Sequence, residues 1–190
     1  AVAAAIVGDG RNLQGLLSKL VKASGGGSDM GESEAVLRVL LQTCRANSAV
    51  AAGVSRSLPA ISFLGNLTKA HPKDPDGGQE ERIRSLGMLL VGAICDSNEG
   101  EKIRGGGDEI VKAVDAKSAV EAMFGGGERD SSPSVHTRVA ASHLCSSLAS
   151  MGGSTRTKVV QTATSALSQL SIEMARHLRP GDARHEGGEE

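Results

Sequence analysis

Aromatic side chains are scarce in this chain of 190 residues, which holds two Phe, no Tyr and no Trp. Proteins that bind single-stranded nucleic acid stack bases on aromatic rings, and the dominant contacts of protein interfaces are rich in Tyr and Trp. A surplus of basic charge is also missing, because 21 Lys and Arg face 22 Asp and Glu, for a formal net charge of −1. Both features argue against nucleic acid or an anionic membrane surface as the partner.

Membrane-spanning and secretory segments are not expected either. No apolar run approaches the roughly 18 residues that cross a bilayer, and the opening AVAAAIVGDG lacks the basic start of a signal peptide. Cys44, Cys95 and Cys145 form no CxxC pair and are odd in number, which is typical of a reducing compartment. We therefore expect an intracellular protein, cytoplasmic by default with an organelle as the other location, and no direct membrane insertion. Because the sequence begins with Ala, we expect a processed form or a piece of a longer protein.

Glycine is abundant, at 25 of 190 residues, and it is clustered. Runs such as 25–27, 105–107 and 125–127 divide the chain into segments of helical length. No stretch alternates apolar and polar residues with the period of a strand. The sequence therefore predicts an all-α fold.

The cysteines indicate a repeat. They end the stretches VLLQTC, LVGAIC and AASHLC, and they are separated by 51 and 50 residues. The residues four and five positions before each cysteine are apolar, and positions i and i+4 share one face of a helix. Each cysteine is therefore predicted to lie on the buried face of a helix. Since packed helices lie about 8–10 Å apart, beyond the ~7 Å limit between the Cα atoms of a disulfide, we expect three free thiols.

A second set of residues at similar spacings supports the same repeat. Gly8, Gly53, Gly105 and Thr162 each stand five residues before an aliphatic residue, at spacings of 45, 52 and 57. Each unit is predicted to be a helix ending near its cysteine, a Gly-marked turn and a second helix, clearest in RNLQGLLSKLVKA. Ser33 and a Ser-Pro pair at 132–133 are predicted helix starts. The expected copies span about 1–30, 33–76, 79–126 and 133–178, followed by a polar, disordered tail over 179–190.

These stretches resemble a known family. The segments 40–67, 89–114 and 138–170, with a partial copy at 3–20, are similar to armadillo repeats and to the related HEAT repeats. The resemblance implies a right-handed α-solenoid of about 3.5 repeats over residues 1–178. Within the family, GAICDSNEGEKI is most similar to the GDP-dissociation stimulators of small GTPases. Without Trp, the chain lacks the ladder that lines nuclear-import receptors, so we do not expect it to bind localisation signals.

Sites of catalysis or metal binding are not predicted. Gly100 and Gly105 have the spacing of a phosphate loop, but no strand precedes them and no Lys-Ser or Lys-Thr follows. His136 and His143 are seven residues apart, whereas zinc ligands on a helix are four apart. No set of nucleophile, base and acid can be assembled. We therefore expect no enzyme activity, no cofactor and no metal.

The resemblance also implies a binding face. In armadillo-like arrays the last helix of each repeat contacts the partner, and the alternative is that the same side chains merely form the solvated face of amphipathic helices. The positions concerned are Arg11, Gln14, Ser18, Lys22, Ser62, Asn66, Lys69, Lys112, Asp115, Ser165 and Gln169. The expected function is that of a protein-interaction scaffold, a subunit or adaptor of a larger assembly. A regulator of a small GTPase and an enzyme with an unrecognised site are the other two hypotheses.

Overall fold

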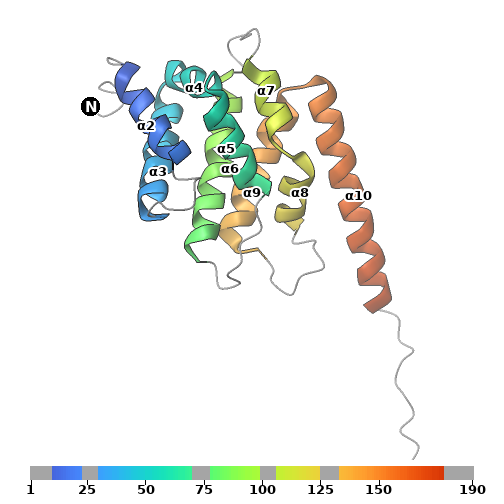
Figure 1. Ribbon diagram of the computed structural model, residues 1–190. Helices are drawn as coiled ribbons and strands as arrows, with labels where there is room; N and C mark the ends of the chain where they lie inside the picture. Colours follow the sequence, from blue (N-terminus) through green and yellow to red (C-terminus); the bar gives the residue numbers. More distant parts are fainter. Residues whose placement is uncertain (1–9, 23–29, 70–77, 99–105, 125–132, 178–190) are drawn as a thin grey trace, which may run out of the picture.

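The computed structural model describes residues 10–22, 30–69, 78–98, 106–124 and 133–177, and within these segments the chain is helical with no strand (Figure 1). The all-α prediction is therefore confirmed. The predictions for residues 3–9, Gly100, Gly105 and the tail 179–190 fall outside the described residues. The helices are α2 (Gly10–Lys22), α3 (Met30–Ala46), α4 (Ser48–Ser55), α5 (Leu58–Lys69), α6 (Gln79–Asn98), α7 (Gly106–Ala113), α8 (Ala116–Phe124), α9 (Val135–Ser150) and α10 (Gly153–His177).

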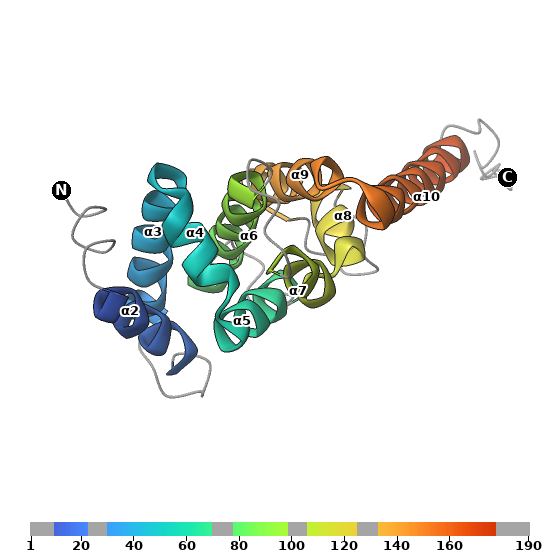
Figure 2. The same cartoon turned by 90° about the horizontal axis from the view of Figure 1, so that it is seen from above.

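Helix α6 is the centre of the molecule. It packs against α3 on one side and α9 on the other, and these three long helices lie next to one another in one layer (Figure 2). The shorter helices α2, α5 and α7 lie in a second layer against them. Helix α10 packs on α8 and α9 through its first turns, and its second half extends past the other helices (Figure 1).

The cysteines lie where their register predicts. Cys44, Cys95 and Cys145 belong to α3, α6 and α9, the three helices of one layer, and all are buried free thiols. Burial raises the pKa of the Cys44 thiol to about 12 and that of Cys145 to about 11. Burial and the neighbouring charge of Asp96 raise the pKa of Cys95 to about 12. The thiols therefore stay protonated at neutral pH and act as small apolar core residues.

Aliphatic side chains of moderate size fill the core, and both Phe63 and Phe124 lie only at its edge. Helices with such a core must approach closely to exclude water. Gly65 of α5 shows how close: a Cβ added there would meet the carbonyl oxygen of Ala113, at the end of α7, at 2.5 Å. On Gly92 of α6, an added Cβ would meet Nδ1 of His143 on α9 at 2.6 Å.

Three boundary predictions were wrong. Gly53 is inside α4, where its missing Cβ leaves room for the Leu13 side chain, and the turn follows at Arg56 and Ser57. Ser33 is a buried residue inside α3, which begins at Met30. Thr162 lies within the continuous helix α10. Near the Ser-Pro pair, α9 begins at Val135 with Ser134 as its N-cap.

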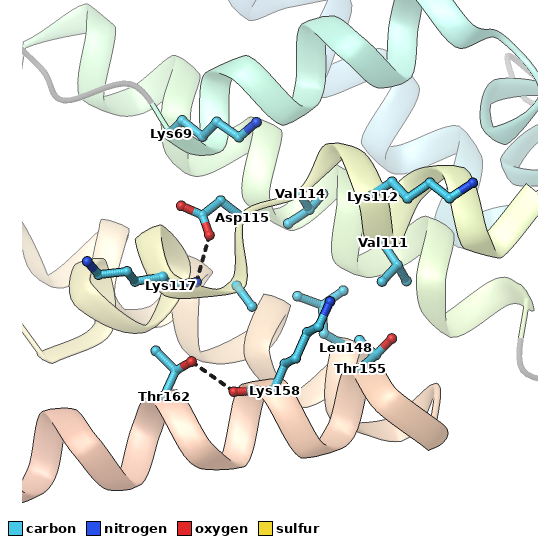
Figure 3. Close-up of a pocket in the computed structure, with 11 residues that line it drawn as sticks. Lys69, Val111, Lys112, Val114, Asp115, Lys117, Leu148, Thr155, Lys158 and Thr162 are labelled. Atoms are coloured by element: carbon cyan, nitrogen blue, oxygen red, sulfur yellow. Dashed lines mark hydrogen bonds between the residues drawn. The ribbon is translucent and has the colours of Figure 1, made fainter.

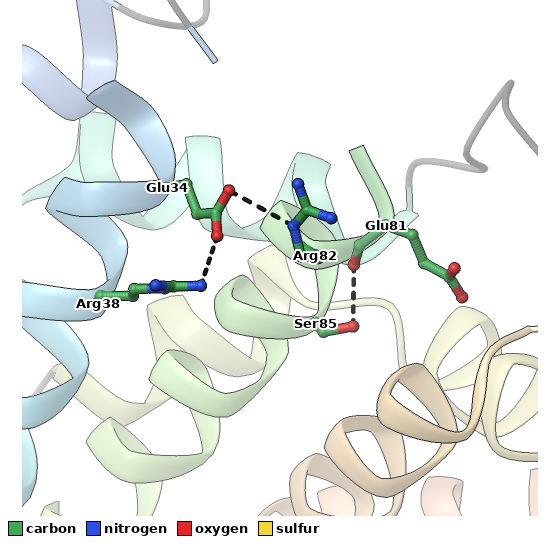
Figure 4. Close-up of polar contacts among 5 residues, drawn as sticks. All are labelled: Glu34, Arg38, Glu81, Arg82 and Ser85. Atoms are coloured by element: carbon green, nitrogen blue, oxygen red, sulfur yellow. Dashed lines mark hydrogen bonds and ion pairs between the residues drawn. The ribbon is translucent and has the colours of Figure 1, made fainter. Parts of the chain in front are cut away.

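A buried polar network joins α6 to the start of α9. One carboxylate oxygen of Glu81 accepts hydrogen bonds from the Ser134 amide at 2.6 Å and the Thr137 hydroxyl at 2.7 Å. The Ser85 hydroxyl lies 2.9 Å from that of Thr137, and it also lies 2.9 Å from the Glu81 carbonyl oxygen, to which it donates (Figure 4). Burial raises the pKa of Glu81, but these hydrogen bonds and the charge of Arg84 outweigh it, so the pKa lies below its usual value. The ionised carboxylate is therefore a structural link between the two helices.

The other side of α6 is linked to α3 by ion pairs. Glu34 of α3 pairs with Arg38 one turn along its own helix, at 2.6 Å, and with Arg82 of α6 at 3.6 Å (Figure 4). The Glu34 side chain is only 14% exposed, whereas both arginines are largely exposed. Polar side chains thus orient α6 against both of its long neighbours.

We expect Gly65→Ala to lower the free energy of unfolding by about 1–3 kcal/mol, because the new methyl group would overlap the backbone of α7. Gly15→Ala in α2 is the matched control, since no atom of another described residue, apart from the two chain neighbours and the local backbone of α2, lies within 4 Å of its added Cβ. That change should stabilise by about 0.5–1 kcal/mol through helix propensity. Urea unfolding of both variants measures the two effects, and equal values would contradict the close approach of α5 and α7.

For Glu81→Gln we expect a loss of roughly 1–3 kcal/mol at pH 7, because a carboxylate oxygen that accepts one buried and one partly buried hydrogen bond loses its charge. Since the folded-state pKa of Glu81 is lowered from 4.5, its stabilisation is complete above pH 4.5 and disappears as pH falls through the folded value. The difference between wild type and variant, measured by urea unfolding, should therefore shrink below pH 4.5. Glu32→Gln, in an exposed ion pair with Lys19, should cost less than about 1 kcal/mol. A pH-independent difference for Glu81→Gln would contradict the prediction.

Candidate functional site

A groove with a volume of about 650 Å³ lies where α5, α7, α8, α9 and α10 meet, and it is partly open to solvent. Its side chains come from segments that are far apart in the sequence (Figure 3). The lining residues are Lys69, Val111, Lys112, Val114, Asp115, Ala116, Lys117, Leu148, Thr155, Lys158 and Thr162. Four of these are lysines, so we call this site the lysine groove.

The junction between α7 and α8 forms one wall of the groove. The Asp115 carboxylate accepts hydrogen bonds from the Lys117 amide at 3.1 Å and from the Ser118 hydroxyl at 2.8 Å. This is the pattern of a helix N-cap, and it begins α8 at Ala116. Among the described lining residues, the one carboxylate is therefore occupied by the helix that it caps.

The lysines belong to four helices: Lys69 ends α5, Lys112 lies in the last turn of α7, Lys117 begins α8 and Lys158 lies near the start of α10. In Figure 3 the amino groups of Lys112 and Lys117 point toward opposite sides, and Lys158 rises from α10 between them. Lys117 lies 3.6 Å from Glu121 on the same helix, whereas Lys69 and Lys158 form no ion pair with any described residue. Positive charge is thus spread along the groove.

The floor between the lysines is mainly apolar. Leu148 of α9 and Val114 are 1% and 7% exposed, and Thr155 of α10 is buried beside them. The hydroxyl of Thr162 donates to the carbonyl oxygen of Lys158 at 2.8 Å, so it is satisfied within α10. The groove therefore combines a charged rim with a floor that favours an apolar group.

Three of the binding residues predicted from the sequence come together here: Lys69, Lys112 and Asp115 all line the groove. The other predicted residues are exposed on α2, α5 and α10 and do not line it. They are Arg11, Gln14, Ser18, Lys22, Ser62, Asn66, Ser165 and Gln169.

Sequence reasoning missed Lys117 and Lys158. In the sequence, Lys117 interrupts the apolar face of a predicted helix. This interruption was the available sign that Lys117 lines the wall of the groove. Lys158 was missed because the register based on Thr162 placed the start of the last helix too late, although α10 begins at Gly153. Both lysines could be identified as groove residues more directly from the helix boundaries than from the repeat pattern.

Within the described segments, the pKa is shifted for the cysteines, Glu81 and Arg84, all of which are buried in the helix packing. Among the described residues, no group of three or more His, Cys, Asp or Glu side chains has the arrangement of a metal site. His136 and His143 lie on α9, and Nε2 of His143 is 3.7 Å from an Asp96 carboxylate oxygen. None of the described helices has the length and apolar character required to cross a membrane.

Comparison of the chain with protein-family models, curated proteins and solved structures found no match.

Proposed function

We propose that this protein is a non-enzymatic protein-interaction scaffold, built as an armadillo-like stack of helices, which serves as a subunit or adaptor of a larger assembly. The arrangement of α3, α6 and α9 supports the proposal. Each of these helices carries one buried cysteine, 51 and 50 residues apart in the sequence, and the helices pack in chain order, as repeats in a solenoid do. Such stacks bind their partners through extended surfaces.

The lysine groove is the observation that carries this function. In the described part of the chain, its ionisable side chains are four lysines and Asp115, whose carboxylate caps α8. An active site needs a nucleophile, base or acid directed at a common point, whereas lysines contributed by four helices suit the surface of a partner. Binding without chemistry is the function that this composition favours.

Isolation of the chain under gentle conditions from its native source should recover it in a stoichiometric complex with a protein. Chemical cross-linking and mass spectrometry would identify the partner and the contacting helices. Recovery of the chain alone, as a monomer that turns over a small-molecule substrate, would contradict the scaffold proposal.

The same experiment distinguishes a scaffold from a GTPase regulator. If the recovered partner is a small GTPase, its nucleotide release is measured with and without the chain. Accelerated nucleotide release would show that the protein is a regulator of the GTPase and not a scaffold. Unchanged release would leave a purely architectural role.

A further inference from the structure

We infer that the lysine groove binds a short, extended acidic segment of the partner protein, with one apolar side chain of that segment placed on the floor of the groove. This inference rests on the proposed scaffold function and narrows it to a class of ligand. It follows from four properties of the groove: its charge, the placement of that charge, its floor and its size.

The charge of the groove differs from that of the whole chain. The formal net charge is −1, yet the lining residues that the structure describes include four lysines and a single carboxylate. Lys69 and Lys158 have no acidic partner among the described residues. A concentration of positive charge in a partly enclosed groove attracts an anionic ligand and repels a basic one.

The placement of the lysines favours an extended ligand over a compact anion. Lys112 and Lys117 direct their amino groups to opposite sides, so they do not converge on one point (Figure 3). The start of α8 is also closed to an anion, because the Asp115 carboxylate already accepts from the Lys117 amide and places negative charge there. Phosphate binding normally uses free amides of this kind at a helix N-terminus. Carboxylates distributed along a peptide match separated ammonium groups better.

The floor offers apolar side chains beneath the charged rim. Val114 and Leu148 lie beneath the rim, and Val111 is a half-buried neighbour. A volume of about 650 Å³ lies within the range of roughly 300–1,000 Å³ that holds a ligand of moderate size. The groove therefore accommodates a few residues of a peptide and not a folded domain.

Nucleic acid is the less suitable polyanion for this surface. Single-strand binding relies on aromatic stacking platforms, and neither Phe63 nor Phe124 lines the groove. Arginine, the usual side chain for bidentate contacts with phosphate, is also missing from the lining residues that the structure describes. Lysines with an apolar floor suit a peptide.

The test measures fluorescence anisotropy of a labelled peptide made of Glu, Asp and Ser with a central Leu. We expect the full chain to bind it more tightly than a Gln, Asn and Ser counterpart, and more weakly as salt is added. Replacing the central Leu with Ser should also weaken binding. Lys158→Glu should lower the affinity by about tenfold or more, because an attraction becomes a repulsion in a partly enclosed site.

Arg156→Glu is the matched control, since Arg156 is exposed on α10, two residues from Lys158, and does not line the groove. It changes the net charge equally and should alter the affinity by less than about twofold. Circular dichroism checks that both variants keep their helices. Equal losses in the two variants, or tighter binding of single-stranded RNA than of the acidic peptide, would overturn the inference.

Binding of the natural partner to the Lys158→Glu variant tests this inference separately from the proposed function. If the partner found by co-isolation still binds Lys158→Glu as tightly as wild type, the scaffold proposal stands and the lysine groove is not its binding site. If no protein partner is recovered at all, the scaffold proposal itself fails.

Discussion

Close approach of the helices around α6 is the constraint on which this structure depends. The core holds aliphatic residues and cysteines, with aromatic rings only at its edge, so the space between helices must be narrow to be filled. Gly65 against Ala113 and Gly92 against His143 are the contacts where this narrowness is most visible. The three cysteines are small residues of the same core, and burial keeps their thiols protonated.

The groove exists because the chain changes direction between α7 and α8 and again after α9. Between α7 and α8 the chain turns at Asp115, whose carboxylate caps the new helix. After α9, Gly152 and Gly153 have φ angles of 77° and 54°, a left-handed conformation that glycine adopts without strain. This turn directs α10 back across α8 and α9, which places Lys158 opposite the α7–α8 junction. Two local turns therefore create the site.

Prediction from the sequence succeeded where helical periodicity alone decided the outcome. The apolar positions before Cys44, Cys95 and Cys145 identify a buried face, and all three cysteines are buried on helices that lie in one layer. It failed where glycine has two possible roles, because Gly53 was interpreted as a turn residue when it allows contact with Leu13 inside a helix. The groove was only partly predictable, because whether Lys69 and Lys158 share a site depends on the three-dimensional path of α10.

The distribution of charge gives the strongest link between this architecture and binding. Ion pairs on α3 and α6, such as Glu34 with Arg82, use opposite charges to orient helices. The lysine groove instead gathers lysines from four helices, and two of them, Lys69 and Lys158, form no ion pair with any described residue. Asp115 offers them little, since its carboxylate accepts hydrogen bonds from α8. A bound acidic segment would bring carboxylates to these two lysines, so the charge of the groove would stabilise the complex.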